Sequence, residues 1–156
     1  MLIIEKVLLL KNSDIFKICK EVDLIEIASI CFEENIDPKT LVFNKGDIGN
    51  CMYFIYSGQV SIHDNEHQLA ILSENEIFGE LSLLDSDTRS ASATALTDCV
   101  LLRIEQDHFY DVVATNADIL KGIMRTLCKR LREQDRANIE MKKSKGTDFL
   151  EKFAVI

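Results

Sequence analysis

Apolar residues recur at helical spacing near both ends of this chain and fall in short runs through its middle. Over residues 2–31 they return every three or four positions, which predicts helices. The sequence Asn12-Ser13-Asp14 interrupts this region with side chains that can cap a helix start. The spacing becomes helical again over residues 105–142, where we expect a short helix from Gln106 to Val113 and a long helix from about Ala117.

The middle of the chain, residues 32–104, reads as short strands separated by turn-forming sequences. These sequences are Asp37-Pro38, Asn44-Lys45-Gly46-Asp47, Ser57-Gly58, His63-Asp64-Asn65-Glu66-His67 and Ser73-Glu74-Asn75-Glu76. Short, evenly spaced strands are typical of sandwiches and jelly-roll barrels. The predicted fold is α+β and mainly β: an antiparallel jelly-roll barrel (a double-stranded β-helix) flanked by N-terminal helices and a long C-terminal helix.

The long helix carries an apolar stripe that must be buried against another element. The stripe consists of Ile119, Leu120, Ile123, Met124, Leu127, Cys128 and Leu131. The residues after Leu131 are polar, so we expect the helix to pack on the barrel first and then to run towards solvent, a partner or a ligand. We expect one domain over residues 1–142 and interpret residues 143–156 as a tail or linker with a short amphipathic end.

The composition fits a single folded domain, with 156 residues and a hydrophobic content of 47%. No apolar run approaches the roughly 20 residues that span a bilayer. The apolar start contains charges and lacks a small-residue cleavage site, unlike a secretory signal. The five cysteines are odd in number and scattered, which indicates reduced thiols. We therefore expect a cytoplasmic protein without a membrane segment.

The formal net charge of −8 is unevenly distributed. Residues 118–156 hold ten Lys and Arg against six Asp and Glu, a net of +4, which leaves −12 for residues 1–117. A negative chain is a poor candidate for non-specific binding to nucleic acids. We interpret the basic C-terminal segment as a solvated helix face, with contact to an acidic partner as the alternative.

Arg89 is the only lysine or arginine between Lys45 and Arg103, a span that carries nine acids. Such a lone cation either pairs with a neighbouring carboxylate, here Asp85 or Asp87, or binds an anion. A surface ion pair would contribute little to stability, whereas a planar guanidinium matches phosphate oxygens with two hydrogen bonds. The residues around Arg89 favour a phosphate, and we expect the side chain to lie on the barrel surface.

The sequence Phe78-Gly79-Glu80, followed by a short apolar run, predicts a tight turn that opens a helical turn. A glycine lets a ligand approach the backbone, and the free N–H groups of such a turn can hold an anion. Glu80 would repel a phosphate unless it faces another group, and a sugar hydroxyl suits it. Ser90 adds a hydroxyl donor beside Arg89. Together these residues predict a site for a phosphate joined to a ribose.

The segment from Phe78 to Ala91 resembles the phosphate-binding cassette of the cyclic-nucleotide-binding domain family, which includes the catabolite activator protein and the regulatory subunit of protein kinase A. The resemblance covers roughly residues 5 to 135 and includes the turn from Asn44 to Asp47, the strand from Met52 to Val60 and the long helix. Many members carry proline where this chain has Thr88.

The resemblance implies that Glu80 accepts a hydrogen bond from the ribose 2′-hydroxyl, that Arg89 neutralises the cyclic phosphate and that Ser90 donates to it. The other implied ligand-binding residues are Gly79, Leu81, Ser82, Ala91, Arg130 and Gln134. Arg130 is implied to reach the cassette glutamate, and Gln134 and Asp135 occupy the place from which bacterial activators read the base. The implied ligand is cAMP, with cGMP left open because these two side chains suit either purine.

Other chemistry has less support in the sequence. His63 and His67, with Glu66, could ligate a metal, but a hairpin tip does not place both imidazoles on one face. No P-loop, Gly-x-Ser-x-Gly, Gly-x-Gly-x-x-Gly or His-Glu-x-x-His motif occurs. We therefore expect no enzyme, no metal and no cofactor. The alternatives are a domain of this fold that has lost nucleotide binding and serves in interaction or dimerisation, and, more distantly, a cupin-type metalloenzyme.

The resemblance implies a sensor that couples cyclic-nucleotide binding to the position of its C-terminal helix and so regulates an attached or partner effector. In bacterial members this helix also forms the dimer seam, so a homodimer through it is a further expectation. Only about fourteen residues follow Lys142, so we do not expect this chain alone to bind DNA.

Overall fold

The computed structural model describes residues 1–85 and 87–154, with side chains described as far as Gly146. Helices α1 (Ile3–Lys11) and α2 (Glu21–Ser29) precede eight strands, and α4 (Gln106–Val113) and α5 (Ala117–Ala154) follow them. The strands are β1 (Cys31–Ile36), β2 (Leu41–Phe43), β3 (Cys51–Ser57), β4 (Val60–Asp64), β5 (His67–Leu72), β6 (Ile77–Phe78), β7 (Ser92–Ala95) and β8 (Cys99–Glu105), with the short helix α3 (Glu80–Leu84) between β6 and β7. The predicted fold class is confirmed.

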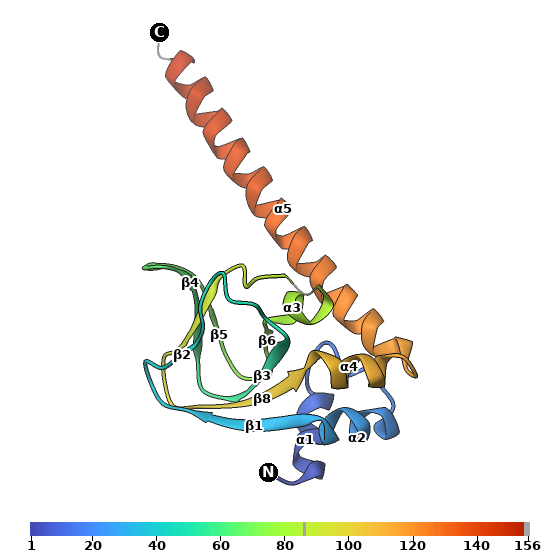
Figure 1. Cartoon of the computed structure of the whole chain (residues 1–156). Coiled ribbons are helices and arrows are strands. Elements are labelled where there is room, and N and C mark those ends of the chain that lie inside the picture. Colours follow the sequence, from blue (N-terminus) through green and yellow to red (C-terminus); the bar gives the residue numbers. More distant parts are fainter. Residues whose placement is uncertain (86, 155–156) are drawn as a thin grey trace.

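The strands form two four-stranded antiparallel sheets, which curve towards each other as a barrel (Figure 1). One sheet has the order β1-β8-β3-β6 and the other the order β2-β7-β4-β5. Each predicted turn sequence connects two successive strands, from the β1–β2 connection to the β5–β6 connection. The helices pack at one end of the barrel, beside β1 and β8, and α5 projects away from it (Figure 1).

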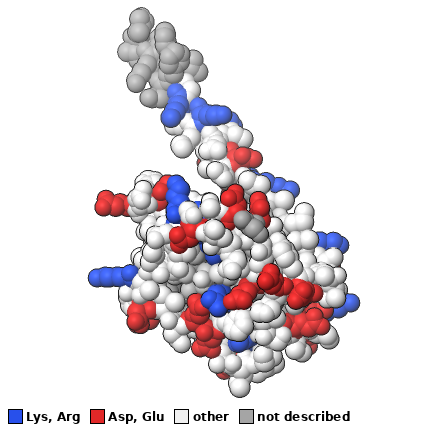
Figure 2. All heavy atoms as spheres, viewed as in Figure 1, with Lys and Arg blue, Asp and Glu red and all other residues white. Residues whose placement is uncertain are grey.

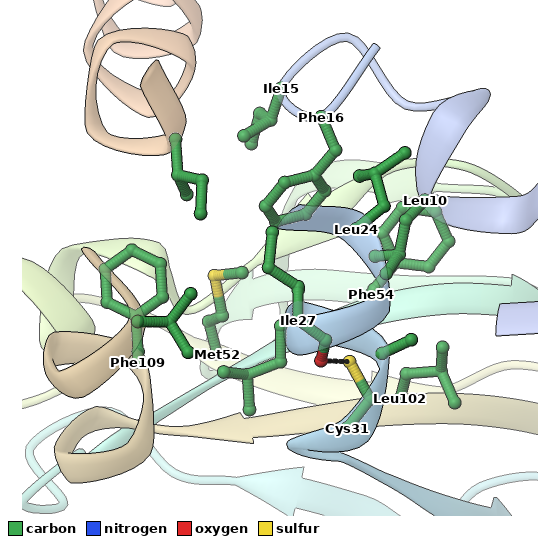
Figure 3. Close-up of a cluster of buried hydrophobic side chains, with 14 of the residues drawn as sticks. Leu10, Ile15, Phe16, Leu24, Ile27, Cys31, Met52, Phe54, Leu102 and Phe109 are labelled. Atoms are coloured by element: carbon green, nitrogen blue, oxygen red, sulfur yellow. Dashed lines mark hydrogen bonds between the residues drawn. The ribbon is translucent and has the colours of Figure 1, made fainter. Parts of the chain in front are cut away.

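Strand β3 is buried on both faces, which explains its unbroken apolar sequence. Met52 and Phe54 point towards the helices and join a cluster with Phe16, Leu24 and Phe109 (Figure 3). The alternate residues face the inside of the barrel and pack in a second cluster, which contains Cys51, Tyr53, Ile55, Phe78, Ala93 and Leu101. The inner cluster supports the loops that carry the candidate site.

Helix α5 departs from its prediction in two ways. Ile119 and Ile123 are fully buried, but the stripe residues Met124, Cys128 and Leu131 are exposed, because the helix leaves the barrel after its first turns. Helix α5 packs most closely on the segment between α1 and α2 at Gly122, where an added Cβ would lie 2.2 Å from the backbone oxygen of Ile15.

The second departure concerns the end of α5, which continues to Ala154 instead of ending near Lys142. Residues 143–154 contain no proline, and the one glycine among them, Gly146, costs only about 1 kcal/mol in a helix interior. A single glycine is therefore not enough to stop the helix. The division into a domain of residues 1–142 and a tail of residues 143–156 stays a prediction.

The surface repeats the charge asymmetry of the sequence. In Figure 2, acidic side chains are frequent over the barrel and the N-terminal helices, and basic side chains recur along α5. No described helix combines the length and apolarity that crossing a membrane requires. All five cysteines are free thiols, and only Cys128 is exposed.

Candidate functional site

A pocket of about 560 Å³ opens between the β6–α3 turn, the loop before β7 and the inner face of β4–β5, and Arg130 of α5 lines one side. Eight of the nine predicted site residues line it: Gly79, Glu80, Leu81, Ser82, Arg89, Ser90, Ala91 and Arg130. Gly79 stands at the start of α3 with a φ of 75°, a left-handed conformation that favours glycine. This turn brings Glu80 and Ser82, both buried, to the pocket wall.

Arg89 lies inside the protein, with only 5% of its surface exposed, so the prediction of a barrel-surface side chain is wrong. Its backbone N–H donates to the oxygen of Asp47 at 2.7 Å, which fixes the loop against the β2–β3 connection. Its Nη1 donates to the carbonyl of Gly79 at 3.1 Å, and its Nη2 donates to the carbonyl of Cys51 at 2.9 Å. The guanidinium is thus held by backbone carbonyls at the base of the pocket.

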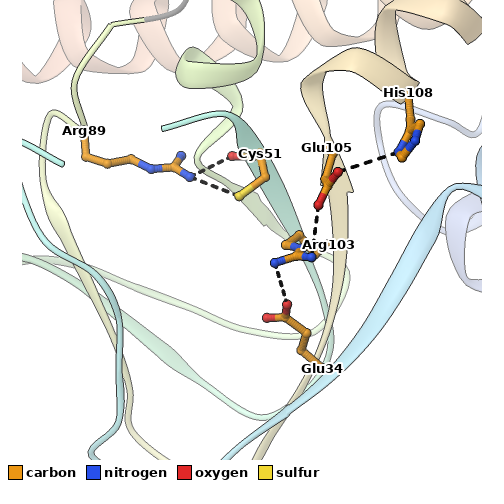
Figure 4. Close-up of polar contacts among 6 residues, drawn as sticks. All are labelled: Glu34, Cys51, Arg89, Arg103, Glu105 and His108. Carbon is orange, nitrogen blue, oxygen red and sulfur yellow. Dashed lines mark hydrogen bonds and ion pairs between the residues drawn. The ribbon is translucent and has the colours of Figure 1, made fainter. Parts of the chain in front are cut away.

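No carboxylate of the described residues pairs with Arg89, which removes the ion pair with Asp85 or Asp87 that the sequence left open. Figure 4 shows the contrast with Arg103, which pairs with Glu34 at 3.0 Å and Glu105 at 3.1 Å. A buried charge without a counter-ion is costly. An anionic ligand could therefore supply the counter-ion that Arg89 lacks. Arg103 already has two carboxylate partners.

Glu80 is 4% exposed, and its Oε1 accepts a hydrogen bond from Nη1 of Arg130 on α5. Nη2 of Arg130 donates to the carbonyl of Ile77 at 3.0 Å. The predicted reach of Arg130 towards the cassette glutamate is therefore present. Among the hydrogen bonds of the described residues, none uses the other carboxylate oxygen of Glu80, which leaves an acceptor at the pocket wall.

Gln134 is the one predicted site residue that the structure does not bring to the pocket. It lies exposed on α5, one turn beyond Arg130, and Asp135 beside it is exposed as well. A role of either side chain in reading the base stays a prediction.

The sequence reasoning missed the apolar wall of the pocket, which consists of Phe43, Ile62, Ala70, Leu72 and Phe78. These residues come from four different strands, so no local motif marks them. The pairing of β4 with β5 could have suggested Ile62, Ala70 and Leu72, because alternate side chains of paired strands share one face.

The pocket also carries acids beyond Glu80, namely Glu76, Asp85 and Asp87. Beneath it, burial raises the pKa of the Tyr53 phenol, and a hydrogen bond with Cys51 raises it further. Tyr53 is therefore neutral at physiological pH and stacks on Phe78, with ring centroids 5.1 Å apart. The polar groups that line this site are therefore the two arginines, Glu80, these three further acids and the serine and threonine hydroxyls.

A metal site finds no support in the described residues, where no group of three or more His, Cys, Asp or Glu side chains could hold an ion. His63 instead makes hydrogen bonds with the carbonyl of Asn65 at 2.7 Å and the hydroxyl of Thr94 at 2.8 Å.

Comparison with known proteins places this pocket in a family. Residues 33–116 match the family model described as the cyclic nucleotide-binding domain. The cyclic AMP receptor protein of Thermus thermophilus is 32% identical over 117 residues, which cover 71% of this chain and 54% of that protein. The chain spans about half the length of the curated relatives it matches.

Two solved structures share the fold. The crystal structure of the Thermus thermophilus catabolite activator protein superposes with a TM-score of 0.73 at 29% identity, covering 79% of this chain and 60% of that chain. The co-crystal structure of the regulatory domain of Toxoplasma gondii PKA with cAMP gives a TM-score of 0.65 at 27% identity, covering 70% of this chain and 44% of that chain.

Proposed function

This chain belongs to the family of cyclic nucleotide-binding domains, and on that premise we propose that its pocket binds cAMP and that the chain is a sensor without catalytic activity of its own. The observation that carries the proposal is the buried guanidinium of Arg89, which faces the pocket without a carboxylate partner among the described residues. A singly charged cyclic phosphate would neutralise it. The pocket volume of about 560 Å³ suits a small ligand.

In the proposed pose, the polar groups of the pocket contact the phosphate and the ribose of the ligand. Arg89 binds the phosphate oxygens, with Ser90 and the backbone N–H groups of α3 as further donors. Glu80 accepts from the ribose 2′-hydroxyl through the carboxylate oxygen that Arg130 does not use. The base lies against the apolar wall that includes Ile62 and Leu72.

The choice of cAMP over cGMP rests on the relatives, one of which is a cyclic AMP receptor and another a PKA domain crystallised with cAMP. Isothermal titration with cAMP and cGMP tests the proposal. We expect one site per chain and tighter binding of cAMP. Absence of binding to both nucleotides would contradict it.

The output of the sensor is proposed to be the position of α5. A ligand can shift a helix only by binding one helix position better than another. The Glu80–Arg130 ion pair supplies such a link, because a ligand that donates a hydrogen bond to Glu80 acts on the same carboxylate that holds Arg130 of α5. The effector that reads α5 is a separate domain or partner protein.

One observation favours a second role in dimerisation. Beyond Arg130, the described residues of α5 as far as Gly146 are all exposed, and they include the apolar side chains of Leu131, Ile139 and Met141. A second copy of α5 would bury them. Sedimentation velocity of the protein and of a Leu131→Gln variant tests this role, which predicts a dimer that the substitution weakens.

A further inference from the structure

We propose that Phe43 and Gly49, two residues outside the cassette, position the guanidinium of Arg89 for the ligand. This inference rests on the proposed function and deepens it. Phe43 ends β2, and Gly49 lies in the β2–β3 connection. Both residues lie against the guanidinium of Arg89, although 40 or more positions separate them from it.

The ring of Phe43 forms a platform under Arg89. The guanidinium carbon lies 4.1 Å from the ring centroid, within the range of a cation–π contact. The ring is itself braced, because its centroid lies 5.9 Å from that of Phe78 and 6.1 Å from that of Tyr53. A desolvated cation gains most from such a contact, and Arg89 is desolvated and lacks a described carboxylate partner.

Gly49 lets the guanidinium of Arg89 lie against the backbone. A Cβ at this position would lie 2.5 Å from Nε of Arg89 and 2.5 Å from the hydroxyl oxygen of Ser82, closer than real Cβ atoms approach. The φ of Gly49 is outside the left-handed region, so an alanine would meet no backbone strain there. The cost of a side chain at position 49 therefore falls on Arg89 and Ser82, two residues of the pocket.

Together these contacts fix the guanidinium while leaving donors for a ligand. A guanidinium has five N–H groups. The two terminal nitrogens of Arg89 carry four of them and make three contacts, to the carbonyls of Gly79 and Cys51 and to the Cys51 sulfur at 3.3 Å, so one terminal N–H is left. Among the described residues, no hydrogen bond uses the Nε–H. The ring face, the glycine and the carbonyls hold the group in one orientation, which reduces the ordering cost when an anion binds.

The test compares cAMP affinities of matched variants. Phe43→Leu removes the ring and should raise the Kd for cAMP roughly 3- to 30-fold. Phe43→Tyr keeps the ring, so its Kd should stay close to that of the unmodified protein. Phe32→Leu is the control, because Phe32 lies under the remote Arg103 at 5.9 Å. Gly49→Ala should raise the Kd at least tenfold, and Ile48→Ala, which alters an 84% exposed neighbour, should not.

A double-mutant cycle distinguishes positioning from a structural role. If the ring acts through the guanidinium, Phe43→Leu should have little further effect in an Arg89→Lys background. Equal losses in both backgrounds, or no loss for either Phe43→Leu or Gly49→Ala in a protein that binds cAMP, would overturn this inference alone. Absence of cAMP binding by the unmodified protein would overturn the proposed function and this inference with it.

Discussion

Arg130 on α5 forms an ion pair with Glu80 at the start of α3, although 50 residues separate the two in the sequence. Glu80 is almost fully buried, whereas the side chain of Arg130 is 42% exposed. The pair therefore joins a helix that projects from the barrel to the wall of the pocket. A ligand that contacts Glu80 would affect α5 through this one contact.

Removing the cation of this pair should loosen α5. In Arg130→Met, the carboxylate of Glu80 keeps its burial and loses its ion-pair partner, so we expect faster amide hydrogen exchange over residues 119–131 and a several-fold weaker affinity for cAMP. Arg132→Met, which alters an exposed arginine on the same helix, is the matched control. Exchange rates equal to those of the unmodified protein would show that the pair does not hold the helix.

The ribose contact predicts discrimination against a missing hydroxyl. A site built to accept from the 2′-hydroxyl leaves a buried carboxylate oxygen unpaired when the hydroxyl is absent. We expect 2′-deoxy-cAMP to bind at least tenfold more weakly than cAMP, and Glu80→Gln to reduce that ratio. Competition binding measures both ratios. Equal affinities of the two nucleotides for the unmodified protein would mean that Glu80 serves Arg130 alone.

Base selection by α5 can be tested by truncation. A chain that ends after Leu131 keeps Arg130 and loses Gln134 and Asp135. If these side chains reach the purine in the bound state, the affinity for cAMP should fall and the ratio of cAMP to cGMP affinities should approach one. A ratio that survives truncation would assign base selection to the apolar wall instead.

The thiols should differ sharply in reactivity. Burial raises the pKa of Cys19 to about 11 and that of Cys31 to about 12, so both stay protonated and unreactive at pH 8. Cys51 and Cys99 are also buried, and Cys128 is exposed. A thiol reagent such as Ellman's reagent should therefore label one cysteine rapidly in the native protein, and Cys128→Ser should remove that phase. Rapid labelling of two or more sites would show that the core opens readily.

Local sequence was enough to predict the barrel, the turns and most of the residues that come together at this pocket. Turn-forming residues and helical spacing are short-range signals, so they located the strand region, five of its turns and the bounds of α4, although the strand predicted from Met52 to Val60 ends at Ser57. The cassette also lies within a short stretch, and Glu80 and Arg89 belong to the same pocket as expected.

The surroundings of Arg89 could not be predicted in the same way. Its burial depends on Phe43, Gly49 and Cys51, which the β2–β3 segment brings from 38 or more residues away, and no spacing rule connects these positions. The predicted burial of the whole apolar stripe of α5 was wrong for a related reason. Apolar spacing indicates which face of a helix needs cover, but it does not show that α5 leaves the barrel before Met124 and Leu131 are covered.

The central claim is that the uncompensated charge of Arg89 binds the phosphate of a cyclic nucleotide. Titrating cAMP into the unmodified protein and into Arg89→Ala tests it most directly, with thermal unfolding at saturating cAMP as the check on folding. We predict that the substitution weakens binding by roughly 2–5 kcal/mol and lowers the stabilisation by a fixed concentration of cAMP. If a folded Arg89→Ala protein binds cAMP as tightly as the unmodified protein, the claim is contradicted.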